Sequence, residues 1–169
     1  MRIFWKSFAF LLISCTSTLQ AADVIFNITG IIKNASCSVS FGNNQTVPLG
    51  TFSTGYLNSV GKKTPLQPFM IKLDNCPNNY DDVQVTFEGD IDAGNPQLLA
   101  LQPGGAQNVG VAIYDSDKTS LIPINTASSG KSVSTTQETT LTFYAAYQST
   151  GTVTEGAANA DVSFTVSYN

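Results

Sequence analysis

The chain has 169 residues, of which only 12% are charged, and it contains no histidine. A formal net charge of −4 argues against nucleic-acid binding, which needs a basic surface. The absence of histidine excludes nucleophilic catalysis of the Ser-His type and removes the commonest metal ligand.

The start of the chain has the pattern of a secretory signal peptide. Arg2 and Lys6 give it a positive beginning, a short apolar stretch follows, and small residues lead up to Ala21. We expect a signal peptide over residues 1–21, with cleavage after Ala22 as the alternative. The apolar stretch is shorter than the roughly 20 residues that a membrane-spanning helix needs.

A bacterial lipobox over residues 12–15, which would place a lipid on Cys15, is the competing interpretation. The signal peptide is favoured because a lipobox leaves the polar run at residues 16–20 and the junction at Ala21 unexplained. Cleavage after Ala21 leaves six lysines against twelve acidic residues, and therefore a net charge of −6. The remaining chain has the length of one domain.

Two cysteines, Cys37 and Cys76, remain after cleavage. An even number of cysteines in a secreted chain predicts a disulfide, and two free thiols are disfavoured in an oxidising compartment. Two cysteines without histidine are not a metal-ligand set.

The exported chain begins with an alternating stretch over residues 22–34. Alternate side chains of a strand point to opposite faces, so this stretch predicts a strand with one apolar row. The residues of that row are Val24, Phe26, Ile28, Gly30 and Ile32. Residues 35–41 are expected to continue as a strand that carries Cys37.

Short alternating or apolar segments, separated by turn signals, follow along the rest of the chain. One of them contains Pro48, which cannot donate to a ladder, so that segment should lie at an edge or a bulge. No window has a sustained helical period, and about seven to nine short strands predict an all-β sandwich. The segments are residues 46–52, 68–73, 83–87, 98–101, 109–114, 121–124, 141–147 and 160–168.

Acidic residues are the remaining candidates for chemistry. Asp90 and Asp92 begin a segment that resembles a calcium loop, but Asn95 and Leu101 stand where an EF-hand requires glycine and glutamate. Aspartates that form turns are the better interpretation. No catalytic, cofactor-binding or metal-binding residue is predicted, and the chain is not expected to be an enzyme.

The exported chain resembles the structural subunits, or pilins, of bacterial chaperone–usher pili, most closely the type 1 fimbrial group. The resemblance extends over residues 22–169. At the end of the chain it rests on Gly156, on alternating apolar residues and on a penultimate tyrosine, Tyr168. The other features are the N-terminal row with its glycine, the spacing of Cys37 and Cys76, and the runs at residues 98–101 and 108–111.

This resemblance implies an incomplete immunoglobulin-like β-sandwich that lacks its last strand. Residues 22–33 would be an N-terminal donor-strand extension, and residues 34–169 the pilin domain. The apolar row would fill pockets of a neighbouring subunit, with Gly30 where the acceptor groove comes too close for a side chain. The strand beside the groove, which a chaperone would cover first, would include Gly156, Val162, Phe164, Val166 and Tyr168.

The expected function is that of a structural subunit of a surface pilus, or fimbria, which polymerises by donor-strand exchange and supports adhesion. The implied partners are a periplasmic chaperone, an outer-membrane usher and neighbouring pilins, with no nucleic acid, small-molecule substrate or cofactor. The chain would pass through the periplasm to the cell surface.

Three alternatives stay open from the sequence. The first is a minor adaptor, or an adhesive subunit that recognises a host ligand, although a tip adhesin carries a lectin domain that this chain lacks. The second is a fibre terminator at the membrane, which the well-formed donor row disfavours. The third is an unrelated secreted β-sandwich enzyme.

Overall fold

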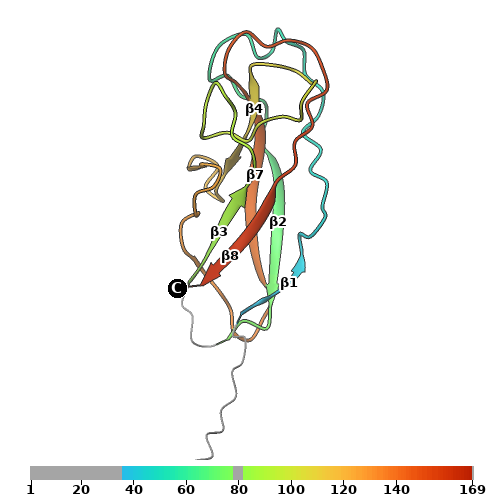
Figure 1. Ribbon diagram of the computed structural model, residues 1–169. Coiled ribbons are helices and arrows are strands. Elements are labelled where there is room, and N and C mark those ends of the chain that lie inside the picture. The colour runs from blue at the N-terminus through green and yellow to red at the C-terminus, as the bar shows by residue number, and fades with distance from the viewer. Residues whose placement is uncertain (1–35, 78–81, 169) are drawn as a thin grey trace, which may run out of the picture. The chain divides into compact units, whose positions relative to one another are not determined.

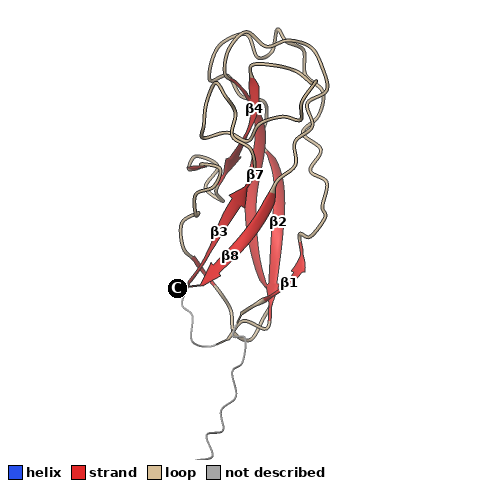
Figure 2. Cartoon of the chain, viewed as in Figure 1, coloured by secondary structure: helices blue, strands red, loops and turns tan. Residues whose placement is uncertain are grey.

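The structure, a computed structural model, describes residues 36–77 and 82–168, which form two antiparallel β-sheets facing each other (Figures 1 and 2). Within these two ranges all regular elements are strands, and no helix with the length and apolarity needed to cross a membrane occurs. The predicted all-β sandwich is therefore confirmed. The N-terminal row from Val24 to Ile32 lies outside the described residues.

One sheet has five strands and the other has three, and every pair of neighbouring strands is antiparallel. The first sheet has the order β1 (Ser38–Phe41), β2 (Gln67–Asp74), β7 (Thr139–Ser149), β4 (Val109–Tyr114) and β5 (Leu121–Ile122). The second has the order β6 (Lys131–Ser132), β3 (Asp82–Glu88) and β8 (Ser163–Tyr168). Strands β1 and β8 are thus edge strands of their sheets.

The core lies between the sheets and is built from the alternating rows that the sequence predicts. In β3, Val83, Val85 and Phe87 are buried while the residues between them are partly exposed. The rings of Phe87 and Phe143 meet edge to face, with centroids 5.1 Å apart. Complete burial of each such side chain contributes about 1.5–3 kcal/mol to folding, so these rows hold the two sheets together.

The predicted disulfide is present. Cys37, just before β1, is bonded to Cys76, just after β2, and their Cα atoms are 4.2 Å apart. Both residues are buried and belong to the main core cluster. The bond therefore fastens the edge strand β1 to its neighbour β2.

The strand predicted over residues 46–52 is wrong, because residues 45–53 form no strand. Pro48 has no N–H to donate, and Gly50 has a φ of 91°, which a strand does not allow. Val47 and Leu49 are nevertheless half-buried, so the segment still turns its apolar side chains inward.

Other predicted strands are shorter than expected, among them those over residues 35–41 and 121–124, which are strands only over 38–41 and 121–122. Around Leu99 only isolated bridges to Ile91 and Val111 form. The last strand begins at Ser163, since the residues before it hydrogen-bond to a loop instead of to β3. The two-residue strand β6 was not predicted, because its Lys-Ser sequence has no apolar pattern.

Candidate interaction groove

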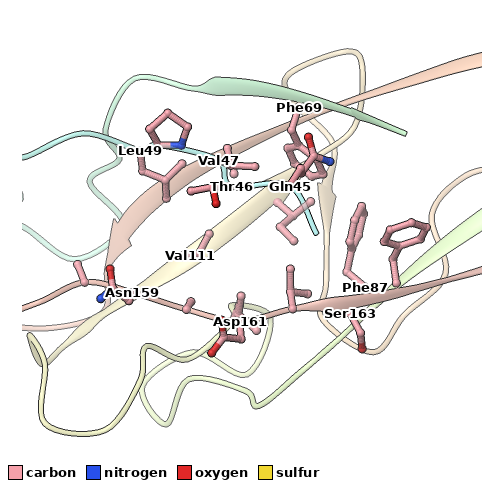
Figure 3. A pocket seen from close by; sticks show the side chains of 18 of the residues that line it. Gln45, Thr46, Val47, Leu49, Phe69, Phe87, Val111, Asn159, Asp161 and Ser163 are labelled. Atoms are coloured by element: carbon pink, nitrogen blue, oxygen red, sulfur yellow. The ribbon is translucent and has the colours of Figure 1, made fainter. Parts of the chain in front are cut away.

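A groove with a volume of about 1120 Å³ opens between the chain around the start of β8 and residues 42–51 (Figure 3). Its floor consists of core side chains from both sheets and from the segment at Leu99, so the groove reaches into the middle of the sandwich. The floor residues are Phe69, Ile71, Phe87, Leu99, Val111, Ile113 and Ala145.

One wall of the groove is the segment that follows β1. Residues 42–51 all line it, although they belong to no strand. Gln45 Nε2 donates a hydrogen bond of 3.1 Å to the carbonyl of Met70, which ties the segment to β2. In Figure 3, Val47 and Leu49 lie across the groove from Asn159 and Asp161.

The opposite wall is formed by residues 158–164, at and before the beginning of β8. Loop residues hold this wall. The backbone N–H of Gln102 donates to the carbonyl of Asn159 at 2.7 Å, and its side-chain amide donates to Asp161 Oδ2 at 2.6 Å. The wall is therefore held in position by a loop outside the sandwich.

Tyr147 connects the floor to this wall. Its hydroxyl donates a hydrogen bond of 2.7 Å to the carbonyl of Ala158, and burial raises the pKa of the phenol. The hydroxyl is therefore a neutral donor throughout the physiological pH range.

The residues predicted for the strand beside the groove do not all lie at the groove. Val162 and Phe164 line the groove. Val166 and Tyr168 are half-buried and pack against the main core cluster farther along β8. The exposed Ser163, Thr165 and Ser167 alternate with them, so β8 has one apolar and one polar face.

Gly156 does not line the groove. It has a φ of 156°, and an added Cβ would lie 2.6 Å from the backbone nitrogen of Ala106. A glycine is thus required where two loop backbones meet, beside the hydrogen bond from the N–H of Ala106 to the carbonyl of Ala157.

Sequence reasoning did not identify Gln102, Tyr147 or residues 42–51 as parts of this site. They come from distant parts of the chain, and only the packing of the two sheets brings them together. Pro48 and Gly50, inside an otherwise alternating run, are the signals in the sequence that this segment does not pair regularly.

The segment that begins at Asp90 and Asp92 and resembles a calcium loop in sequence forms a turn. Asp92 Oδ1 accepts hydrogen bonds from the backbone N–H groups of Gly94 and Asn95, at 2.9 and 3.0 Å. In the described part of the chain, no group of three or more His, Cys, Asp or Glu side chains is placed to hold a metal ion.

Comparison with known proteins identifies the family. The family model for fimbrial proteins matches residues 26–169. The type-1 fimbrial protein A chain of Escherichia coli K12 is 37% identical over 166 residues, which cover 92% of this chain and 91% of that protein.

Solved structures share the fold. A Burkholderia pseudomallei antigen and type I fimbria protein has a TM-score of 0.63 and 30% identity, over 79% of this chain and 89% of that one. The P pilus rod subunit PapA has a TM-score of 0.69 at 22% identity, over 80% of this chain and all of that one. The chain therefore belongs to the fimbrial protein family, the subunits of type 1 and related chaperone–usher pili.

Proposed function

We propose that this chain is a structural subunit of a surface pilus and that it polymerises by donor-strand exchange. The observation that carries the proposal is the open groove, whose apolar floor belongs to the main core cluster and whose wall leads into the edge strand β8. An edge strand beside a groove that reaches the core is a template for pairing with another strand.

The chain also has a segment suited to cover such a groove. Residues 22–33 carry an alternating apolar row, and an added strand gains main-chain hydrogen bonds while its alternate side chains fill pockets. Burial of Val24, Phe26, Ile28 and Ile32 would contribute about 6–12 kcal/mol before the cost of ordering the segment. Gly30 would pass where the groove is too narrow for a side chain.

This function requires partners that cover the groove before assembly. A periplasmic chaperone would lend a strand, an outer-membrane usher would exchange it for the extension of the next subunit, and the fibre would appear at the cell surface. The fibre supports adhesion by extending from the cell. In this role the chain performs no catalysis, because its activity is the pairing of strands.

The test begins with the exported chain purified together with a periplasmic pilus chaperone. After release of the chaperone, unboiled samples are run on a denaturing gel, with and without residues 22–33. A ladder of bands that appears only when the extension is present supports strand exchange. It also supports the interpretation that one copy of this chain can follow another in the fibre. No ladder, with capture of the extension peptide by a different pilin, would indicate a minor adaptor.

A matched pair of variants tests whether the groove is the acceptor. Val162 lines the groove and is 43% exposed, so Val162→Asp places a charge there without disturbing the core. Ser167→Asp places the same charge on the exposed face of β8. Only Val162→Asp should suppress the ladder. A stable monomer that needs no partner would contradict the proposal.

A further inference from the structure

We infer that the outer face of the five-stranded sheet binds an acidic polysaccharide, with Lys63 and Lys118 on its anionic groups and Tyr144 against a sugar ring. None of these residues lines the groove between the sheets, so the site is separate from the one described above. The inference rests on the proposed function in one respect, because a fibre repeats the site along its length.

Four side chains form a row across this outer face. The strand registers place Leu121 opposite Tyr114, Tyr114 opposite Tyr144, and Tyr144 opposite Pro68. Directly opposite side chains of antiparallel strands lie on the same face of a sheet. Both tyrosines alternate along their strands with residues of the main core cluster, so the row points away from the core. The ring of Tyr144 is only half-buried and is open to a ligand.

Two lysine ammonium groups lie over this row. Lys63 Nζ is 4.5 Å from the centroid of the Tyr114 ring, and Lys118 Nζ is 5.0 Å from the centroid of the Tyr144 ring. Each ring attracts the cation above its face and thereby restricts a flexible side chain. Since less side-chain freedom is then lost when an anion binds, the two positive charges are preorganised for a ligand.

These two charges have no carboxylate partner in the part of the chain that the structure describes. The ion pairs found there involve Lys72 and Lys131 instead. Asp117, next to Lys118 in sequence, directs its carboxylate to the backbone N–H and the hydroxyl of Ser120. Two cations that lie over aromatic rings are therefore available to an external anion.

Charge and chemistry favour an acidic polysaccharide over other anions. A nucleic acid requires a larger basic surface than two lysines provide. An acidic polysaccharide combines spaced sulfate or carboxylate groups with sugar rings, whose apolar C–H faces can pack against a half-buried tyrosine ring. A fibre presents the same site on every copy, so weak contacts with one long polymer add up to firm binding.

The test measures the binding of polymers to assembled fibres that are immobilised on a sensor surface at low salt. Heparin is the sulfated probe, hyaluronan the carboxylated probe and dextran the neutral control, while polyglutamate is an anion without sugar rings. We expect wild-type fibres to bind at least one of the two acidic polysaccharides, and this binding should weaken as salt screens the charges. Equally tight binding of polyglutamate would show attraction by charge alone and overturn the inference.

Single charge removals locate the site. Lys63→Gln and Lys118→Gln should each lower the affinity of one subunit for the polysaccharide by about two- to fivefold, and the loss should be larger in the fibre. Lys72→Gln is the matched control, because it removes the same charge from the same sheet but from an ammonium that already pairs with Glu138. An equal loss of affinity in Lys72→Gln would overturn the inference.

The outcomes separate the inference from the proposed function. If fibres form but bind neither acidic polysaccharide, the inference fails and strand exchange stands. If heparin binds the soluble subunit but not the fibre, neighbouring copies cover this face, and the inference is overturned as well. If the chain forms no fibres, the proposed function fails, and the same probes are applied to the monomer, where binding that requires Lys63 and Lys118 supports the site and its absence overturns it.

Discussion

The side-chain ammonium of Lys131, in β6, contacts the carboxylate of Asp115, the residue that follows β4. Because β4 and β6 belong to different sheets, this ion pair joins the two layers of the sandwich. Asp115 is only 5% exposed and also accepts a hydrogen bond of 2.7 Å from the Ser129 hydroxyl.

Replacement of Lys131 by methionine should lower the free energy of unfolding by about 1–3 kcal/mol, because it leaves a buried carboxylate without its counter-ion. The measurement is urea denaturation of the subunit complemented with a peptide of residues 22–34. Lys72→Met is the matched control, since Lys72 pairs with Glu138 at 2.7 Å on the surface, where such pairs contribute at most about 1 kcal/mol. Equal losses in the two variants would contradict a special role for the buried pair.

At low pH, the free energy of unfolding should depend on the protonation of the Asp115 carboxylate. Burial tends to raise the pKa of this carboxyl, but hydrogen bonds from Lys131, Ser129 and Ser116 outweigh it and hold the pKa below its usual range. A depressed pKa in the folded state gives stability that is complete above the unfolded value of about 3.9 and is lost as the pH falls below it. Unfolding midpoints measured from pH 6 to pH 2 should therefore fall less steeply in Asp115→Asn than in the wild type.

The disulfide should contribute much of the stability of the subunit. Cys37 and Cys76 are 39 residues apart in sequence, and a loop of this length corresponds to about 4 kcal/mol in the chain-entropy account. Joint replacement of both cysteines by serine should lower the unfolding free energy by roughly this amount in the peptide-complemented subunit. A loss below about 1 kcal/mol would show that β1 is held in place without the bond.

The contact between two loops depends on Gly105. An added Cβ would lie 2.1 Å from the carbonyl oxygen of Ala157, on the segment that leads into the groove wall. Gly105→Ala should therefore destabilise the subunit by about 1–3 kcal/mol and slow capture of the extension peptide. Gly55→Ala, where the nearest atom beyond the chain neighbours is 3.8 Å away, is the control and should leave both quantities nearly unchanged.

The Tyr147 hydroxyl should affect binding of the extension peptide in the groove more than it affects packing of the core. Tyr147→Phe keeps the ring but removes the hydrogen bond to the carbonyl of Ala158, a loss of about 1 kcal/mol. We expect weaker binding of the extension peptide, measured by calorimetry or by the rate of exchange. Tyr56→Phe, on an exposed ring, should bind the peptide as the wild type does.

Much of the fold could be predicted because local rules decide it. The alternation of Val83, Val85 and Phe87 with polar residues describes a strand with one buried face, and the structure confirms β3 where this pattern lies. The pairing of Cys37 with Cys76 followed from the count of cysteines alone. The predicted strand over residues 46–52 is wrong because the backbone constraints of Pro48 and Gly50 outweigh the apolar alternation of that segment.

The sequence by itself determined the class of the sandwich, the disulfide, the resemblance to pilins and the apolar row of residues 22–33. These depend on periodicity, composition and spacing, which can be read along the chain. Only the tertiary structure decided that Leu99, Val111 and Tyr147 share one groove, that Gln102 holds Asp161, and that Gly156 serves a loop contact. Such contacts join residues far apart in the sequence, and they exist only once the two sheets have packed against each other.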